Sequence, residues 1–366
     1  MADPAAVEAT VDPYQNYDLR AVADEARDPR VRFAFEHPEL LARFRAADVV
    51  AMDSKQASRR LGFLSVGFVL AAMLIASGGP VFEGMEHEAH RIIGYVSAGL
   101  GVIGTLIGLS ALRKNSARHK WLQARLQTEV MRLLHFHVMA SRLPEIAQVK
   151  GDPAKQAAYL AERSVAFERL NAKILSNPAA ELERIASGHD LADFDIGVPE
   201  ASISGNEDPE VIELVLIVWR KLRLDWQLGY CKAKLAHKAT GKRLSSRQTE
   251  HAFSTFAWIA IGIIIALHIS QFGADMLHLP VAWMEVIVVW TALSALAARA
   301  IEDGLKPQRE VERYEQYKAN IMVTAERLDA AQDLSSKLEI IRSFERVGLE
   351  EMRVFMRTHA KSRFLL

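Results

Sequence analysis

The chain has 366 residues, and its 45 Lys and Arg residues balance its 45 Asp and Glu residues, so the formal net charge is zero. This balance provides no overall attraction for a nucleic-acid backbone, and we expect no nucleic-acid partner. The single cysteine, Cys231, excludes an intramolecular disulfide framework. The mean hydropathy of +0.03 averages strongly apolar and strongly charged stretches.

Two loose regions and two pairs of apolar stretches organise the chain. Residues 1–37 contain Pro4, Pro13 and Pro29, which would interrupt a helix, and we expect this segment to be loosely ordered. It lacks a basic region followed by an apolar core, so no signal peptide is expected and the first apolar stretch would direct insertion. Residues 189–208 form an acidic stretch with Gly and Pro, which predicts a loop.

The apolar pairs cover residues 61–82 with 92–112, and residues 252–272 with 281–300. Each stretch has the roughly 20 residues that a helix needs to cross a hydrocarbon core about 30 Å thick. A short connector joins the members of each pair. The sequence therefore predicts an all-α membrane protein with four transmembrane helices in two hairpins, and the lipid bilayer is its first partner.

Basic residues flank the apolar pairs, whereas the two connectors contain few of them. The flanking residues are Lys55, Arg59, Arg60, Arg113, Lys114, Arg118, Lys120, Lys238, Lys242, Arg243, Arg247, Arg299, Lys306 and Arg309. Positive residues are retained on the cytoplasmic side, so this pattern predicts cytoplasmic N- and C-termini. Only the two connectors would face outward.

Helical spacing of apolar residues continues outside the membrane stretches. A helix should begin at Pro38 and run through Arg60 into the membrane, because Pro suits the first helical turn. Further helices are predicted at residues 114–141, from Asp152 and Pro153, and at residues 178–187, 210–238, 308–332 and 334–358. The helix at 114–141 would continue the second membrane helix as one rod. In the last helix, Glu345 is predicted to face outward.

These elements divide the chain into five consecutive segments. They are residues 1–37, the first hairpin with its flanking helices at 38–142, cytoplasmic helices and the acidic loop at 143–208, the second hairpin with its flanking helices at 209–332, and a last cytoplasmic helix at 333–366. The similar spacing of the two hairpins favours a tandem duplication. The flanking helices are expected to form a cytoplasmic helical bundle.

Glycines recur in the second apolar stretch. Gly101, Gly104 and Gly108 lie on one helical face, and the Gly104–Gly108 spacing lets another helix approach closely. One interpretation is close packing within the hairpin. The other is an assembly seam between copies of the chain.

Polar residues in the second apolar pair are candidates for a pore. Glu285 lies near the start of the fourth stretch, His268 near the outer end of the third, and Thr291 further along the fourth. A charged group in the membrane is costly unless it is paired or faces water. Glu285 could pair with His268 or line an oligomeric pore. Alternatively, it is a carboxylate at a helix N-terminus next to interfacial water.

Two charged helix faces contain an embedded tryptophan and are candidates for a partner or ligand surface. The faces carry Trp121, Arg125, Glu129 and Arg132 in one helix, and Arg223 and Trp226 in another. The alternative is packing between helices with surface ion pairs.

Motifs of catalytic and metal sites are missing from the sequence. There is no Walker, GxSxG or Rossmann motif, and His87 and His90 are three positions apart rather than the four of a zinc-binding helix. We therefore expect no enzyme, no cofactor and no metal.

The arrangement resembles the SLATT superfamily, the two-transmembrane-helix effectors of bacterial conflict systems. The resemblance depends on the charged helix at 55–60 before the hairpin, the Trp121, Arg125, Glu129 and Arg132 helix after it, and Arg223, Trp226, Gln227 and Tyr230 before the third span. It covers most of the chain as two copies. It implies a pore-forming effector of the bacterial inner membrane, coupled to a sensor protein or small ligand.

Two functions follow as hypotheses. The first is a homo-oligomeric membrane effector or channel, gated through its cytoplasmic helices and permeabilising the membrane in antiviral defence. The second is a non-conducting membrane scaffold that anchors a cytoplasmic signalling partner.

Overall fold

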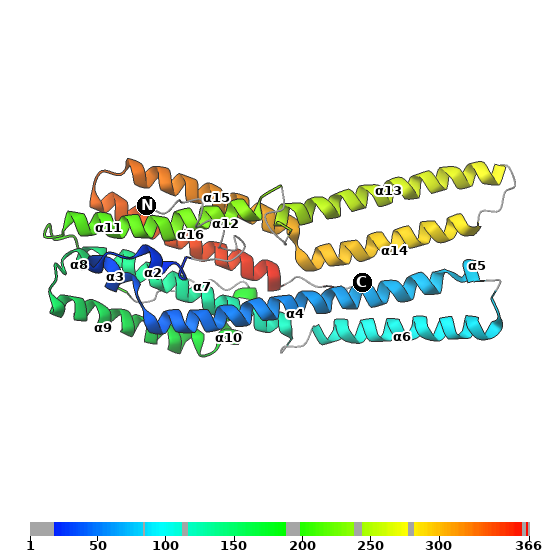
Figure 1. Ribbon diagram of the computed structural model, residues 1–366, viewed down its shortest axis with the longest axis horizontal. Coiled ribbons are helices and arrows are strands. Elements are labelled where there is room, and N and C mark those ends of the chain that lie inside the picture. Colours follow the sequence, from blue (N-terminus) through cyan, green and yellow to red (C-terminus); the bar gives the residue numbers. More distant parts are fainter. Residues whose placement is uncertain are drawn as a thin grey trace. The chain divides into compact units, whose positions relative to one another are not determined.

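The computed structural model describes residues 18–82, 85–111, 116–187, 198–237, 244–276, 282–360 and 364. Every regular element in these residues is a helix (Figure 1). The chain forms two compact units. The bundle unit contains Met1–Ala51, Leu122–Ser245 and Arg309–Ala360, and the span unit contains Met52–Trp121, Ser246–Gln308 and Lys361–Leu366. The two predicted hairpins thus lie in one unit, and the five predicted segments stay a prediction.

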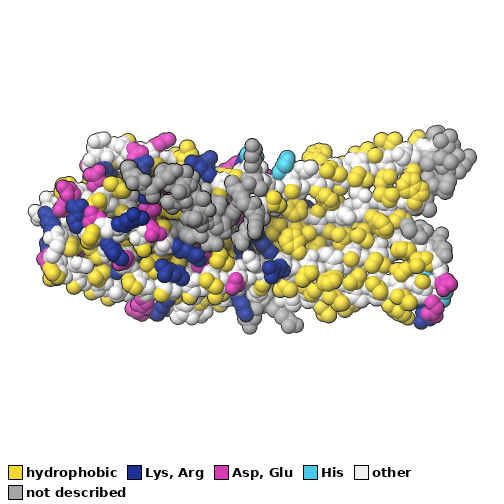
Figure 2. Space-filling view, viewed as in Figure 1, with side chains coloured by type: hydrophobic (Ala, Val, Ile, Leu, Met, Phe, Trp, Pro, Cys, Tyr) yellow, Lys and Arg dark blue, Asp and Glu magenta, His cyan; other side chains and the backbone are white. Residues whose placement is uncertain are grey.

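The span unit contains the four helices of the described chain that are long and apolar enough to cross a membrane. They are α4 (Pro38–Ser77), α6 (His87–Ala111), α13 (Ser246–Met276) and α14 (Ala282–Leu305), with the short α5 (Gly79–Phe82) between the first two. No more than 17% of each apolar window is buried. On the face drawn in Figure 2, hydrophobic side chains cover most of this unit. Such helices indicate a multi-pass membrane protein.

Hydrogen bonds and close packing join these helices in the order α6, α4, α14, α13. Ser65 Oγ of α4 donates to the carbonyl of Gly104 in α6, 2.9 Å away. Trp290 Nε1 of α14 donates to the carbonyl of Leu74 in α4, 3.0 Å away. Helix α13 packs along α14. Figure 1 shows α6 and α13 at opposite edges of this unit, so α4 and α14 are its inner helices.

The bundle unit is built from shorter helices and includes the first part of α4. These helices are α2 (Val22–Glu25), α3 (Pro29–Phe35), α7 (Ala117–Ser141), α8 (Leu143–Ala147), α9 (Pro153–Leu170), η1 (Asn171–Leu175), α10 (Pro178–Ala186), α11 (Pro209–Arg220), η3 (Lys221–Asp225), α12 (Trp226–Lys234), α15 (Pro307–Ala330) and α16 (Leu334–Ala360). Charged side chains gather on the surface of this unit (Figure 2). Aromatic rings fill its interior, as in the edge-to-face contact of Trp219 with Phe344 at 5.8 Å.

Helix starts in the bundle unit follow a local sequence signal. Asp152, Asn177 and Asp208 each precede a proline, and each side chain accepts a hydrogen bond from a backbone N–H of the first turn. Pro at the first helical position costs nothing there because its missing N–H would have no helical partner. The predicted helix starts at Pro153 and Pro178 are confirmed.

Two local expectations differ from the structure. Of the segment predicted to be loosely ordered, residues 1–17 lie outside the described residues, but residues 22–35 contain the helices α2 and α3, which bury Val22 and Val31, Ala34 and Phe35. Pro29 begins α3 rather than interrupting a helix, because Asp28 caps it. The single rod predicted from the second span to residue 141 is two helices, α6 and α7. Ser116 accepts a hydrogen bond from the backbone N–H of His119, which starts α7 anew.

Candidate functional site: a buried ionic network

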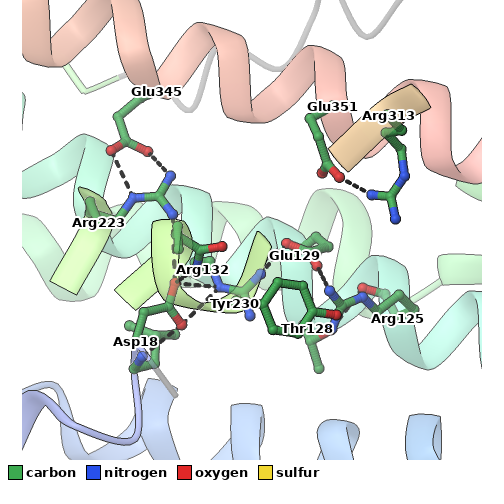
Figure 3. A network of polar contacts seen from close by, with 12 residues as sticks. Asp18, Arg125, Thr128, Glu129, Arg132, Arg223, Tyr230, Arg313, Glu345 and Glu351 are labelled. Atoms are coloured by element: carbon green, nitrogen blue, oxygen red, sulfur yellow. Dashed lines mark hydrogen bonds and ion pairs between the residues drawn. The ribbon is translucent and has the colours of Figure 1, made fainter. Parts of the chain in front are cut away.

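A network of charged side chains lies inside the bundle unit (Figure 3). Its members come from five parts of the chain: the segment before α2, and helices α7, η3, α15 and α16. They are Asp18, Arg125, Glu129, Arg132, Arg223, Arg313, Glu345 and Glu351. Ionised side chains inside a protein are rare unless they are paired, so this network is the strongest candidate for a functional element of the bundle unit.

Asp18 is the centre of one half of the network and is fully buried. Its carboxylate lies 2.8 Å from Nε of Arg132 and accepts a hydrogen bond from Gln227 Nε2 at 2.9 Å. Nη1 of Arg223 lies 3.6 Å away. One carboxylate therefore ties the N-terminal segment to α7, η3 and α12, which are distant in sequence.

Arg223 joins this half to the last helix. Its guanidinium pairs with both oxygens of Glu345, at 3.0 and 2.7 Å, and the two side chains are 2% and 3% exposed. It also stacks over Phe136, with 4.7 Å from Cζ to the ring centroid. A bidentate pair of this kind fixes both distance and orientation. The prediction that Glu345 faces outward is therefore wrong, because Arg223 provides a buried partner.

A π-helical turn places Arg223 in the interior. η3 interrupts the rod of α11 and α12, and three consecutive residues, Leu222, Arg223 and Leu224, are no more than 2% exposed. A regular surface helix turns consecutive residues by about 100°, so it buries one stripe rather than three neighbours in a row. The widened turn allows an arginine to be buried between two leucines. Such turns occur often at functional sites.

The other half of the network is held by α7, α15 and α16. Glu129 pairs with both Arg125 and Arg132, and Arg313 pairs with Glu351. The hydroxyl groups of Tyr230 and Tyr314 lie 3.3 Å apart beside these pairs. The two halves therefore meet at Arg132 of α7, which pairs with both Asp18 and Glu129, and α16 also contributes one carboxylate to each half.

Neighbouring charges keep Glu129, Arg132 and Arg223 ionised despite burial. Burial alone would raise the pKa of Glu129, but Arg125 and Arg132 outweigh it and lower that pKa to about 2. Burial alone would lower the pKa of Arg132 and of Arg223. Asp18 and Glu129 raise the pKa of Arg132, and Glu345 raises the pKa of Arg223. Four carboxylates face four guanidinium groups, so the network has no net charge. Loss of any one member leaves a buried charge unbalanced.

A second buried cluster contains Arg163, His37 and His135, and the ion pairs among the described residues include none to Arg163. Arg163 is 6% exposed and donates to the backbone carbonyls of Phe33 and Ala34 at 2.8 and 3.3 Å. Burial, with Arg163 nearby, lowers the pKa of His37 to about 4 and that of His135 well below its usual range. Both histidines are therefore neutral at pH 7 and would be costly to protonate. Sequence reasoning missed this cluster, since isolated histidines carry no spacing signal.

The predicted partner faces lie largely inside the molecule. Glu129, Arg132 and Arg223 are buried, and Arg125 is only partly exposed at 23% of its side chain. Trp121 is 8% exposed. Trp226 is half-buried. The structure thus agrees with the alternative of helix packing with ion pairs, except that the pairs are buried rather than on the surface.

The polar residues of the apolar helices are accessible in the structure. Glu285 lies in the first turn of α14 and is exposed. His268 Nδ1 lies 2.8 Å from the carbonyl of Ile264, and Thr291 Oγ1 donates to the carbonyl of Ile287 at 2.8 Å. The contacts described for His268 and Glu285 do not include a bond between them, and a role of either residue in a pore stays a prediction.

The glycines of α6 face α4 of the same chain. A Cβ atom on Gly104 would lie 2.9 Å from the backbone N of Val69, and one on Gly108 would lie 2.8 Å from Ser65 Oγ. Gly101 is in ordinary contact range of Ala72. These distances support the alternative of close packing inside the hairpin. A seam between copies at these three positions stays an untested prediction.

The described residues contain no group of three or more His, Cys, Asp or Glu side chains placed to hold a metal ion. Comparison with protein-family models, curated proteins and solved structures gives no match to this chain.

Proposed function

We propose that this protein is an oligomeric effector or channel of the bacterial inner membrane, gated through the helices of its bundle unit. The observation that carries the proposal is the combination of four largely exposed apolar helices with a buried ionic network on the same chain. The basic flanks support cytoplasmic termini and a cytoplasmic bundle unit. A role in antiviral defence, with a sensor protein or small ligand as trigger, is supported only by the resemblance to SLATT proteins.

The order of the apolar helices supports an assembly of several copies. The inner helices α4 and α14 are the first helix of one hairpin and the second helix of the other, and they contact each other. The equivalent contact, between the first helix of the second hairpin and the second helix of the first, would join α13 to α6. Within the span unit these two helices lie at opposite edges (Figure 1). In the proposed assembly α13 of one copy contacts α6 of the next, which is a head-to-tail contact that can close into a ring. Glu285 and Thr291 would then line the path.

The buried network supports gating. Interactions inside a low-dielectric core are strong, and a cluster of ion pairs has few alternative arrangements of similar free energy. A sensor or ligand that favours a second arrangement of α7, η3 and α16 would shift the whole bundle unit between two states. Because α4 belongs to both units, a change at its first turns is passed along one continuous helix.

Ion flux from liposomes tests the proposal. The full chain is reconstituted with a K⁺ gradient, and we expect flux that Glu285→Gln reduces and that Glu88→Gln, a substitution in the exposed first turn of α6, leaves unchanged. Oligomeric protein that shows no flux, alone or with the network variant Arg223→Met that loosens the bundle, would contradict the channel. That result would instead favour a membrane scaffold for a cytoplasmic partner.

A further inference from the structure

The residue of interest is Phe364, which lies near the C-terminus and packs within the span unit. Its side chain joins the apolar cluster of Val66, Ala297 and Ala300, from the inner helices α4 and α14. Its ring also lies 6.2 Å from the ring of Phe63. An aromatic side chain between two apolar helices is therefore part of their packing.

Two glycines make room for this ring. A Cβ atom on Gly62 of α4 would lie 2.5 Å from Cγ of Phe364, and one on Gly304 of α14 would lie 2.3 Å from its Cδ1. Non-bonded carbon atoms prefer about 3.5–4.0 Å, so neither position tolerates any side chain while the ring is present. The ring is thus held against the backbone of both inner helices at once. Elsewhere on α4, Gly67 has no atom within 4 Å of such a Cβ, so this arrangement is not general to its glycines.

We propose that Gly62 and Gly304, with Phe63, Val66 and Ala300, form a docking site for an aromatic side chain, and that its occupant is Phe364 of the C-terminal segment. The site binds the ring by apolar burial and close backbone contact, without a charged group. Lys306, Arg59 and Arg60 lie next to it in sequence, which places it at the end of the apolar stretches that carries basic residues.

Docking of Phe364 holds α4 and α14 together and ties them to α16. Helix α16 ends at Ala360, four positions before Phe364, and four extended residues span at most about 14 Å. A movement of the end of α16 beyond this reach would pull on the docked ring. The pull on the ring rests on the proposed gating, in which α16 moves with the ionic network. The docking site itself does not depend on that gating.

A peptide of residues 359–366 tests the docking site by binding. The protein is the full-length Phe364→Ala variant in nanodiscs, and the labelled peptide is followed by fluorescence anisotropy. We expect saturable binding, lost when the phenylalanine of the peptide is replaced by alanine. The wild-type chain should bind the peptide about tenfold or more weakly, because its own tethered segment competes at an effective concentration of the order of mM.

Matched glycine substitutions in the Phe364→Ala background locate the site. Gly304→Ala should abolish peptide binding, and Gly67→Ala, on an open position of α4, should leave it unchanged. Binding that does not distinguish the two peptides, or that survives Gly304→Ala, would overturn the docking site. Flux separates the docking site from its part in gating. If Gly304→Ala removes binding but neither it nor Phe364→Ala alters flux in the wild-type assay, the docking site stands and its coupling to the proposed gating fails.

Discussion

Removal of Arg223 should destabilise the bundle unit more than removal of any exposed arginine. Arg223 and Glu345 are 2% and 3% exposed and pair at 2.7 Å. Two unit charges about 4 Å apart attract by about 4 kcal/mol at an effective dielectric constant of 20. Arg223→Met fills a similar volume but leaves Glu345 buried without a partner. Breaking a buried pair in this way costs about 3–5 kcal/mol.

Thermal unfolding of the purified chain in detergent, followed by circular dichroism, measures this effect. For a unit of roughly 200 residues, each kcal/mol changes Tm by about 2–4 °C, so we expect Tm to fall by roughly 6–20 °C. The double variant Arg223→Met with Glu345→Leu should recover most of the loss. It removes both charges, and Asp18 keeps its partner Arg132.

An exposed pair provides the control. Arg32 and Glu36 pair on the surface of α3, with side chains 55% and 36% exposed. Such pairs contribute about 0.3–0.5 kcal/mol, so Arg32→Met should change Tm by no more than about 2 °C. If Arg223→Met and Arg32→Met have the same effect, or if the double variant is no more stable than Arg223→Met, the argument for a buried, coupled network is refuted.

Three further predictions concern pH, the first hairpin and assembly. The folded-state pKa of His37 is about 4, below its ordinary value of 6.5, so the stability gained from keeping it neutral is present above pH 6.5 and lost as pH falls toward 4. We expect Tm to fall over that range, and to fall less in His37→Gln. Gly104→Val should reduce the yield of folded protein in size-exclusion chromatography because of its contact with Val69, whereas Gly99→Val, in open space, should not. Val102 of α6 and Ile259 of α13 are 59% and 55% exposed, and the double variant Val102→Cys with Ile259→Cys should form disulfide-linked multimers on oxidation if α13 of one copy contacts α6 of the next. The native Cys231 is buried and should not compete for the disulfide. Monomers alone would contradict the head-to-tail contact.

Local signals in the sequence predicted where helices lie, but they did not predict which charged side chains of those helices are buried. Asp152 before Pro153 marks a helix start because the cap and the fixed proline backbone involve only neighbouring residues. The same reasoning gave Glu345 an outward position, since a charged residue at helical spacing has the same pattern on an exposed face and in a buried pair. Its partner Arg223 is 122 positions away, and no local pattern links the two.

The candidate site shows the same division. Arg132 and Arg223 were selected by their helices, but as parts of an exposed surface. Asp18, which lies between them in the structure, was not selected at all because it stands in a segment with no periodic pattern. The π-helical turn at Arg223 was also unforeseen, because the residues of η3 have ordinary helix-forming composition.

The sequence alone determined that this protein has four helices able to cross a membrane and where most of its other helices begin, because length, apolar composition and caps act within a few residues. The tertiary structure alone decided which charges are buried together, which helices of the span unit are neighbours, and that Phe364 lies between Gly62 and Gly304. Those features depend on contacts between residues far apart in the chain, whose free energy exists only once the helices have packed.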